Sequence, residues 1–131
     1  MATDANISLV PDGTPVTDTN STAQTAVNIL PGGTPMRGLK ARVIYSAASA
    51  ASGTDTVYWK IQSSATSGGT YVDIATSQKD QITLTTTAAS GEVSIPFHTD
   101  GSQPWIKIAS VFSSNAHTDT CTYYADVILQ A

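Results

Sequence analysis

Two histidines with the same short neighbourhood are the first residues in this sequence that could do chemistry. His98 and His117 lie 19 residues apart, and each is followed by Thr and then Asp, at Asp100 and Asp119. Imidazole and carboxylate groups bind zinc, so the two pairs could hold a metal ion if the fold brought them together. An Asp in a turn more often caps local backbone amides. We therefore expect these residues to shape turns, and we predict no metal site and no cofactor.

A nucleophilic enzyme would need a Ser, Thr or Cys beside an activating base. Roughly a quarter of the chain is Ser or Thr, so the nearness of one of them to a histidine in sequence carries no information. The G-x-S-x-G motif, which exposes a nucleophilic serine on a strand-to-helix turn, does not occur. The one cysteine, Cys121, lies on the apolar side of an alternating segment, where a buried and inert thiol is expected. We predict no catalytic residue and a protein that is not an enzyme.

Aromatic residues could instead bind a partner. Trp59 alternates with Val57 and Ile61, so we expect it in the core. Tyr58 and Tyr124 fall on the opposite faces of their segments, where an exposed aromatic ring indicates a subunit contact. An alternative is that such rings form a sugar-binding platform.

The elements that position these residues are short strands. Residues 55–75 show the pattern best, with an alternating segment, a turn at Gly68-Gly69 and a second apolar segment. In the rest of the chain, turn residues likewise separate short apolar segments, which is typical of an all-β sandwich. We expect about eight strands, at 24–30, 38–47, 55–63, 70–75, 80–86, 91–97, 104–113 and 119–130.

One segment also fits a helix. Residues 39–51 are rich in Ala, which favours helix, but Val43, Ile44 and Tyr45 favour a strand. We expect a strand followed by a loop over the Ala/Ser tail.

Composition narrows the class of protein. Of the 131 residues, 40% are hydrophobic and only 12% charged, with a formal net charge of −4. The six basic residues are scattered, so a nucleic-acid partner is not expected. No apolar run reaches membrane-spanning length, and a single cysteine cannot form an internal disulfide. We expect a polar N-terminal arm at 1–22 and one sandwich domain at 23–131.

The order of motifs along the chain resembles a known group of proteins. The polar start leads to AVNIL and a Pro-Gly-Gly loop, and then to LKARVIYSA, VYWKIQSSATSGGTYVDIA, a strand ending in Pro96-Phe97, PWIKIASVF and TYYADVILQA. This order, over about residues 23–131, resembles the small jelly-roll cement, or decoration, proteins of tailed-bacteriophage capsids.

The resemblance implies a fold and a role. The fold would be a two-sheet antiparallel β-sandwich, a jelly roll, with an extended N-terminal arm. The protein would be made in the host cytoplasm and would act on the virion as a homotrimer on the outside of the head. There, at threefold or quasi-threefold positions, it would bridge copies of the major capsid protein. An arm of 22 residues spans about 70 Å when extended, and it could add a strand to a neighbour's sheet through Ile7, Leu9 and Val10.

Two other functions are compatible with the same residues. The first is a carbohydrate- or receptor-binding module on a virion surface, which would use exposed rings such as Tyr58 or Trp105. The second is a minor head or tail protein of the same fold, which would be present in far fewer copies per particle.

Overall fold

The computed structural model describes residues 7–10, 14–19, 21–29, 36–99, 102–114 and 118–129. Within these residues the chain forms ten strands and one short 3₁₀ helix, η3 (Gln78–Asp80). The strands are β1 (Ile7–Ser8), β2 (Val16–Asp18), β3 (Val27–Asn28), β4 (Met36–Ala50), β5 (Asp55–Ser64), β6 (Val72–Thr76), β7 (Ile82–Leu84), β8 (Ala89–Thr99), β9 (Trp105–Phe112) and β10 (Asp119–Leu129).

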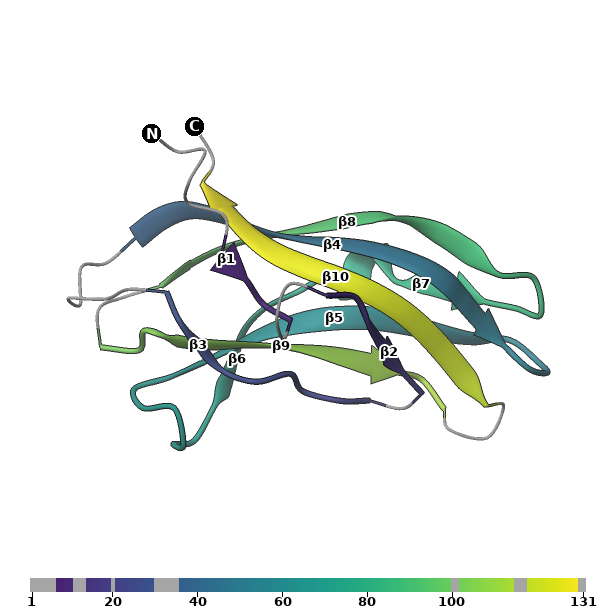
Figure 1. Cartoon of the computed structure of the whole chain (residues 1–131), viewed down its shortest axis with the longest axis horizontal. Helices are drawn as coiled ribbons and strands as arrows, with labels where there is room; N and C mark the ends of the chain where they lie inside the picture. The colour runs from purple at the N-terminus through teal and green to yellow at the C-terminus, as the bar shows by residue number, and fades with distance from the viewer. Residues whose placement is uncertain are drawn as a thin grey trace.

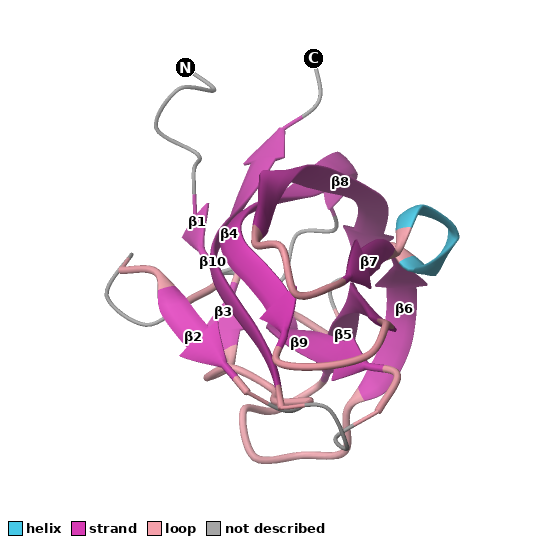
Figure 2. Ribbon diagram, turned by 90° about the vertical axis from the view of Figure 1, so that its right-hand side faces the viewer, coloured by secondary structure: helices cyan, strands magenta, loops and turns pink. Residues whose placement is uncertain are grey.

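The strands form two antiparallel sheets packed face to face. In the first sheet, β10 lies between β4 and the two short strands β1 and β2, and β8 follows on the far side of β4. In the second sheet, β9 lies between β3 and β5, and both β6 and β7 pair with the other edge of β5. Figure 1 shows β1 and β2 one after the other along β10. Figure 2 looks along the length of the molecule and shows the two layers, with η3 at one edge.

The order of strands is that of a jelly roll. β1 and β2 share one edge of β10, at residues 126–127 and 121–123, and β6 and β7 likewise share one edge of β5. Each sheet therefore has four strand positions. The chain changes sheet at every connection between positions except the β5–β6 hairpin. The predicted two-sheet antiparallel β-sandwich with about eight strands is confirmed.

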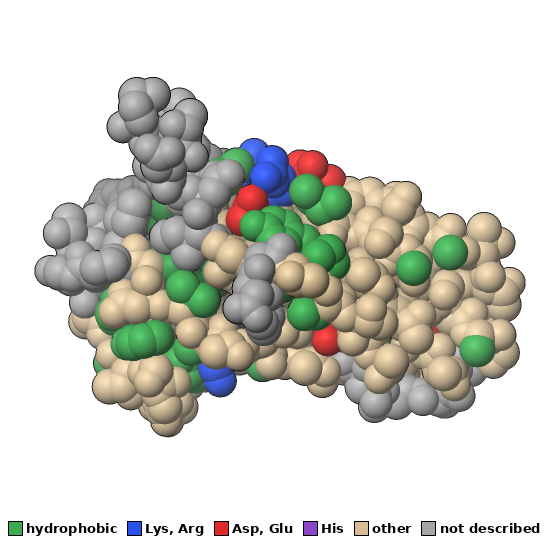
Figure 3. Space-filling model, in the orientation of Figure 1, with side chains coloured by type: hydrophobic (Ala, Val, Ile, Leu, Met, Phe, Trp, Pro, Cys, Tyr) green, Lys and Arg blue, Asp and Glu red, His purple; other side chains and the backbone are tan. Residues whose placement is uncertain are grey.

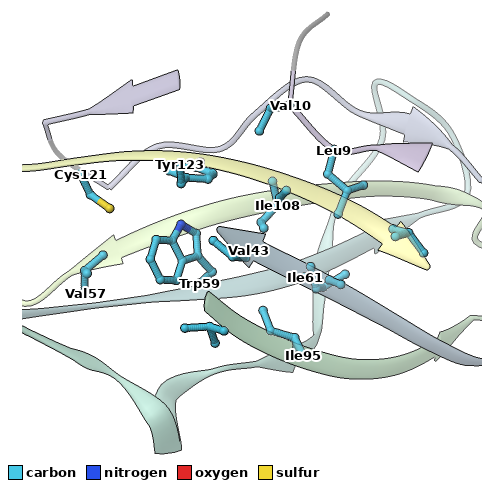
Figure 4. Close-up of a cluster of buried hydrophobic side chains, with 14 of the residues drawn as sticks. Leu9, Val10, Val43, Val57, Trp59, Ile61, Ile95, Ile108, Cys121 and Tyr123 are labelled. Atoms are coloured by element: carbon cyan, nitrogen blue, oxygen red, sulfur yellow. The ribbon is translucent and has the colours of Figure 1, made fainter. Parts of the chain in front are cut away.

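Alternation along the strands builds the core. In β5, Val57, Trp59 and Ile61 are buried, while the residues between them are half-buried on the outer face. The Trp59 ring packs between Tyr45 and Tyr123, with ring centroids 5.8 Å and 5.5 Å apart. Figure 4 shows this ring among aliphatic side chains from both sheets. The expectation that Trp59 is a core residue is confirmed.

The Ala/Ser tail after Tyr45 is strand, so the prediction of a loop there was wrong. β4 continues to Ala50, and its register with β8 shifts between Tyr45 and Ala48. At this bulge Ala47 has a φ of 52°, in the left-handed region. The extra residue reverses the alternation, so that Ala48 and Ala50 both turn into the core.

The described part of the N-terminal segment lies on the sandwich. β1 and β2 pair with β10, and Leu9 and Val10 are only 1% and 4% exposed in the core. Figure 4 shows both side chains beside β10. Residues 1–6, 11–13 and 20 of the predicted arm lie outside the described residues. No helix in the described ranges is long and apolar enough to cross a membrane.

Candidate functional site

The outer face of the first sheet presents an apolar pair. Tyr124 of β10 lies directly opposite Ile44 of β4 on the outer face, and Tyr124 also packs against the hydrophobic cluster with part of its side chain. Ile44 is 44% exposed, and Tyr124 is half-buried. We call this surface, with Arg42, Asp126 and Glu92, the Tyr124 face. In Figure 3, apolar, basic and acidic side chains gather over β10 and β4.

An ion pair lies next to this apolar pair. The Arg42 guanidinium donates to both carboxylate oxygens of Asp126, at 2.8 Å and 3.3 Å. The Asp126 side chain is almost fully buried, although it is on the outer face. The hydrogen bond to Asp126, then the charge of Asp126, and to a lesser extent Glu92, raise the pKa of Arg42. The two hydrogen bonds and the ion pair therefore hold the guanidinium in one place on the Tyr124 face.

The outer face of the second sheet has a different character. Tyr58 of β5 lies opposite Val111 of β9, and a shallow hollow of about 330 Å³ begins beside Val111. Asp73 accepts a hydrogen bond from Gln62 at 3.0 Å and forms an ion pair with Lys60 at 3.4 Å. The residues that line the hollow are Ser21, Thr22, Ala23, Lys60, Gln62, Ala109, Ser110 and Val111.

A buried polar cluster joins the two sheets. The Asp18 carboxylate accepts hydrogen bonds from the Ser110 hydroxyl at 2.7 Å and from the Gln24 amide at 3.3 Å. Gln24 also donates to the Tyr123 hydroxyl at 3.1 Å. Ser110 in turn accepts from the Thr22 backbone N–H at 3.3 Å. Because a buried carboxylate is costly unless it is hydrogen-bonded, this cluster holds β2 and the segment after it on the sandwich.

Cys121 faces the same buried region. Burial raises the pKa of its thiol to about 12, and the negative charge of Asp18 adds to the shift. The thiol therefore stays protonated at neutral pH, and a protonated thiol is a poor nucleophile. The prediction that Cys121 is buried is confirmed.

The structure separates the predicted partner-binding residues into three places. Tyr58 and Tyr124 lie on the outer faces of different sheets, so one flat surface cannot cover both. Leu9 and Val10 are part of the chain's own core, and Ile7 pairs through its backbone with Val127. A role for residues 7–10 in binding a partner stays a prediction, and it would require the segment to leave the core.

The histidines do not form a described site. His98 is exposed in β8, whereas His117 and Asp100 lie outside the described residues. Asp119 is buried at the start of β10. In the part of the chain that the structure describes, no three His, Cys, Asp or Glu side chains are grouped so that they could hold a metal ion. The expectation that the chain has no metal site stays a prediction.

Sequence reasoning missed both the hollow and the polar cluster. Asp18 and Ser110 are 92 residues apart in sequence, and the hollow joins residues 21–23 to β5 and β9. Only strand pairing brings these residues together, so no local pattern could have indicated which of them meet. Ala109 was one signal, because a small residue on the outer face of a strand leaves a depression between larger neighbours.

No protein-family model, no curated protein and no solved structure matches this chain. The function is therefore argued from the residues and surfaces described above.

Proposed function

We propose that this chain is a structural virion protein, a cement protein that binds the outside of a tailed-phage head. As a homotrimer at threefold or quasi-threefold positions, it would bridge copies of the major capsid protein and stabilise the shell. The jelly-roll fold supports this proposal, because it is the fold that the resemblance to such proteins implies. Fold alone does not establish function, so the argument rests on a surface.

The Tyr124 face is the observation that carries the proposal. Interface cores are enriched in aromatic residues and poor in unpaired charge, and Tyr and Arg are common among the residues that dominate binding. This face offers Tyr124 and Ile44 next to an Arg42 that Asp126 already holds. A partner could cover it without burying an unpaired charge from that pair.

Trimerisation would let modest contacts stabilise a shell. Once one subunit is bound, the other two bind at a high effective concentration, which can raise overall affinity by about 10²–10⁴. A sandwich held by a continuous core does not need to fold on binding, so little ordering entropy opposes each contact.

The structure changes how the N-terminal segment has to be tested. Deletion of residues 1–20 would remove Leu9, Val10 and Asp18 from the folded body. Loss of shell binding by such a truncation would then report unfolding as well as lost contact. A point substitution on the Tyr124 face separates the two effects.

The test combines light scattering of the isolated protein with co-sedimentation on empty expanded shells of the phage that encodes it. We expect a trimer that sediments with the shells, and about tenfold weaker binding for Tyr124→Ala. The matched control is Tyr58→Ala, which removes the same side chain from the other outer face. Circular dichroism and thermal melting confirm that both variants are folded. A wild-type protein that stays monomeric and does not sediment with shells overturns the proposal, and equal loss in the two variants removes the Tyr124 face from it.

A further inference from the structure

The hollow on the second sheet has the dimensions of a small ligand site. It lies on the outer face, where residues 21–23 run beside β9, and its volume of about 330 Å³ is at the small end of the range for ligand pockets. It is lined from three separate segments, the chain before β3, strand β5 and strand β9. Because β5 and β9 pair along eight residues, two of its walls are set by a regular ladder.

Small and apolar side chains form one part of the lining. Ala23 bridges to Ala109 across the edge of β9, and Val111 lies two residues further along the strand. Tyr58 is the cross-strand partner of Val111 and is half-buried on the same face. Tyr58 is not itself part of the lining, but Ala23, Ala109 and Val111 give the hollow an apolar surface that suits the C–H face of a flat ring.

Polar side chains form the rest of the lining. Lys60 and Gln62 are oriented by their shared partner Asp73, so the positive charge at the rim is already balanced. Lys60 keeps further N–H donors beyond the one that faces Asp73. The Ser21 hydroxyl accepts from the Phe112 backbone N–H at 2.9 Å, which leaves its own hydrogen to donate.

These features together select one class of ligand. A charged ligand would have to compete with Asp73 or with Lys60 for their existing partner. A neutral molecule with several hydroxyl groups and a flat apolar face matches both the balanced rim and the apolar part of the lining. We propose that this hollow binds one neutral hexose unit of a glycan, a function beyond the attachment to capsids proposed above.

The expected affinity is low. A single hexose has few atoms and the hollow is shallow, so we expect a Kd on the order of 1–10 mM for a free monosaccharide. Several copies on one particle would raise the effective affinity for a polysaccharide.

The test is an amide NMR titration of the ¹⁵N-labelled full chain with four neutral probes. These are the methyl pyranosides of glucose, galactose, mannose and N-acetylglucosamine. We expect at least one of them to shift the amide signals of residues 21–23, 60–62 and 109–111 in a saturable way. If none of the four does so, or if the shifts fall on β4 and β10, the proposal is overturned.

Two variants examine the chemistry of the site. Lys60→Met keeps the aliphatic stem and removes the N–H donors, and we expect it to weaken binding by about fivefold or more. The matched control is Lys107→Met, on the same outer face, where Lys107 packs over the Tyr71 ring outside the lining of the hollow. Ala109→Val, which fills the depression, should also weaken binding. Equal loss in Lys60→Met and Lys107→Met contradicts the proposal.

A fifth probe, galacturonate, tests the role of charge. Binding of galacturonate without binding of any neutral probe would mean that the Lys60 charge leads recognition, and the proposal of a neutral sugar would be wrong. Shell co-sedimentation of Lys60→Met should equal that of the wild type. The proposal of a sugar site and the proposal of a capsid contact can therefore be contradicted by separate experiments.

Discussion

Ser110 connects the two sheets through a single hydroxyl group. It donates to the buried Asp18 carboxylate at 2.7 Å and accepts from the Thr22 backbone at 3.3 Å. Replacing it by Ala leaves the buried carboxylate with one hydrogen bond fewer. We therefore expect Ser110→Ala to lower the free energy of unfolding by about 2–3 kcal/mol, as measured by urea denaturation.

The control for this prediction lies in the strand that holds Asp18. Thr17 shares a hydrogen bond of 2.7 Å with Thr122, but this pair is exposed. Water replaces an exposed hydrogen bond, so Thr17→Ala should cost about 0.5 kcal/mol or less. Similar losses in the two variants would show that the Asp18 cluster does not stabilise the fold as argued.

Ala47 has a backbone conformation that favours glycine. Its φ of 52° lies in the left-handed region, and its side chain is exposed. Changes in side-chain packing therefore contribute little to the free energy of unfolding of variants at this position. Ala47→Gly should raise the free energy of unfolding by about 0.5–1 kcal/mol. Ala47→Val places a β-branched side chain at the same φ and should lower it by about 1–2 kcal/mol. Urea denaturation of both variants checks the order, and a Val variant at least as stable as the Gly variant contradicts it.

At the scale of the element, β1 is short but well anchored. It pairs with β10 over two residues, and the Leu9 backbone N–H donates to the Ala125 carbonyl at 2.8 Å. Leu9 is only 1% exposed, so Leu9→Ala should lower the free energy of unfolding by about 2–5 kcal/mol.

An exposed aliphatic residue provides the comparison for Leu9. Val72 in β6 is 48% exposed, and Val72→Ala should change stability by about 0.5 kcal/mol or less. Thermal melting of the two variants distinguishes a segment built into the sandwich from a free arm. A Leu9→Ala variant as stable as the wild type would mean that residues 7–10 do not stay in the core in solution.

The strands differ in how much of them could be predicted. β5 and β10 were predicted almost to their ends, because alternation along one strand reports its own burial. The end of β4 was not, because a bulge at Ala47 reverses the alternation, and Ala and Ser carry little signal of which side is buried. The places of β1 and β2 depend on β10, more than 100 residues later, so composition alone indicated a separate arm.

For the surface residues too, only the features that depend on a single strand could be predicted. That Tyr58 and Tyr124 lie on outer faces could be predicted from their neighbours in the strand. That they lie on different sheets could not, because it depends on which strands pair. The hollow beside Val111 and the fixed Arg42 likewise arise from pairing between distant strands.

At the scale of the whole molecule, the two proposed activities would use two different outer faces. The Tyr124 face has an apolar pair beside a fixed ion pair, and the face with Tyr58 has the hollow with its balanced polar rim. Because the sandwich core separates them, a molecule held to a shell by the first face would still present the second. The two proposals are therefore compatible and can be tested on the same protein.

Alkaline pH should destabilise the whole sandwich in a defined window. Burial raises the pKa of the Cys121 thiol from its ordinary 9.0 to about 12, and burial also raises the pKa of Tyr123 above its ordinary 10.0. Both groups are neutral when protonated, and the folded state holds the proton at pH values where the unfolded chain has lost it. Their contribution to stability is therefore complete below about pH 9 and is lost as the pH rises toward 12.

Cys121→Ala isolates the part of this loss that belongs to the thiol. Between about pH 8 and pH 10 the thiol of the unfolded chain goes from mostly protonated to mostly ionised, whereas Tyr123 in the unfolded chain reaches half-ionisation only at the upper end of this range. The wild type should then lose about 1.4 kcal/mol of unfolding free energy through Cys121. The variant should be spared that loss, as measured by urea denaturation at the two pH values. Equal losses in the two proteins would mean that the thiol is not buried in solution, because only a buried thiol keeps its proton in this range.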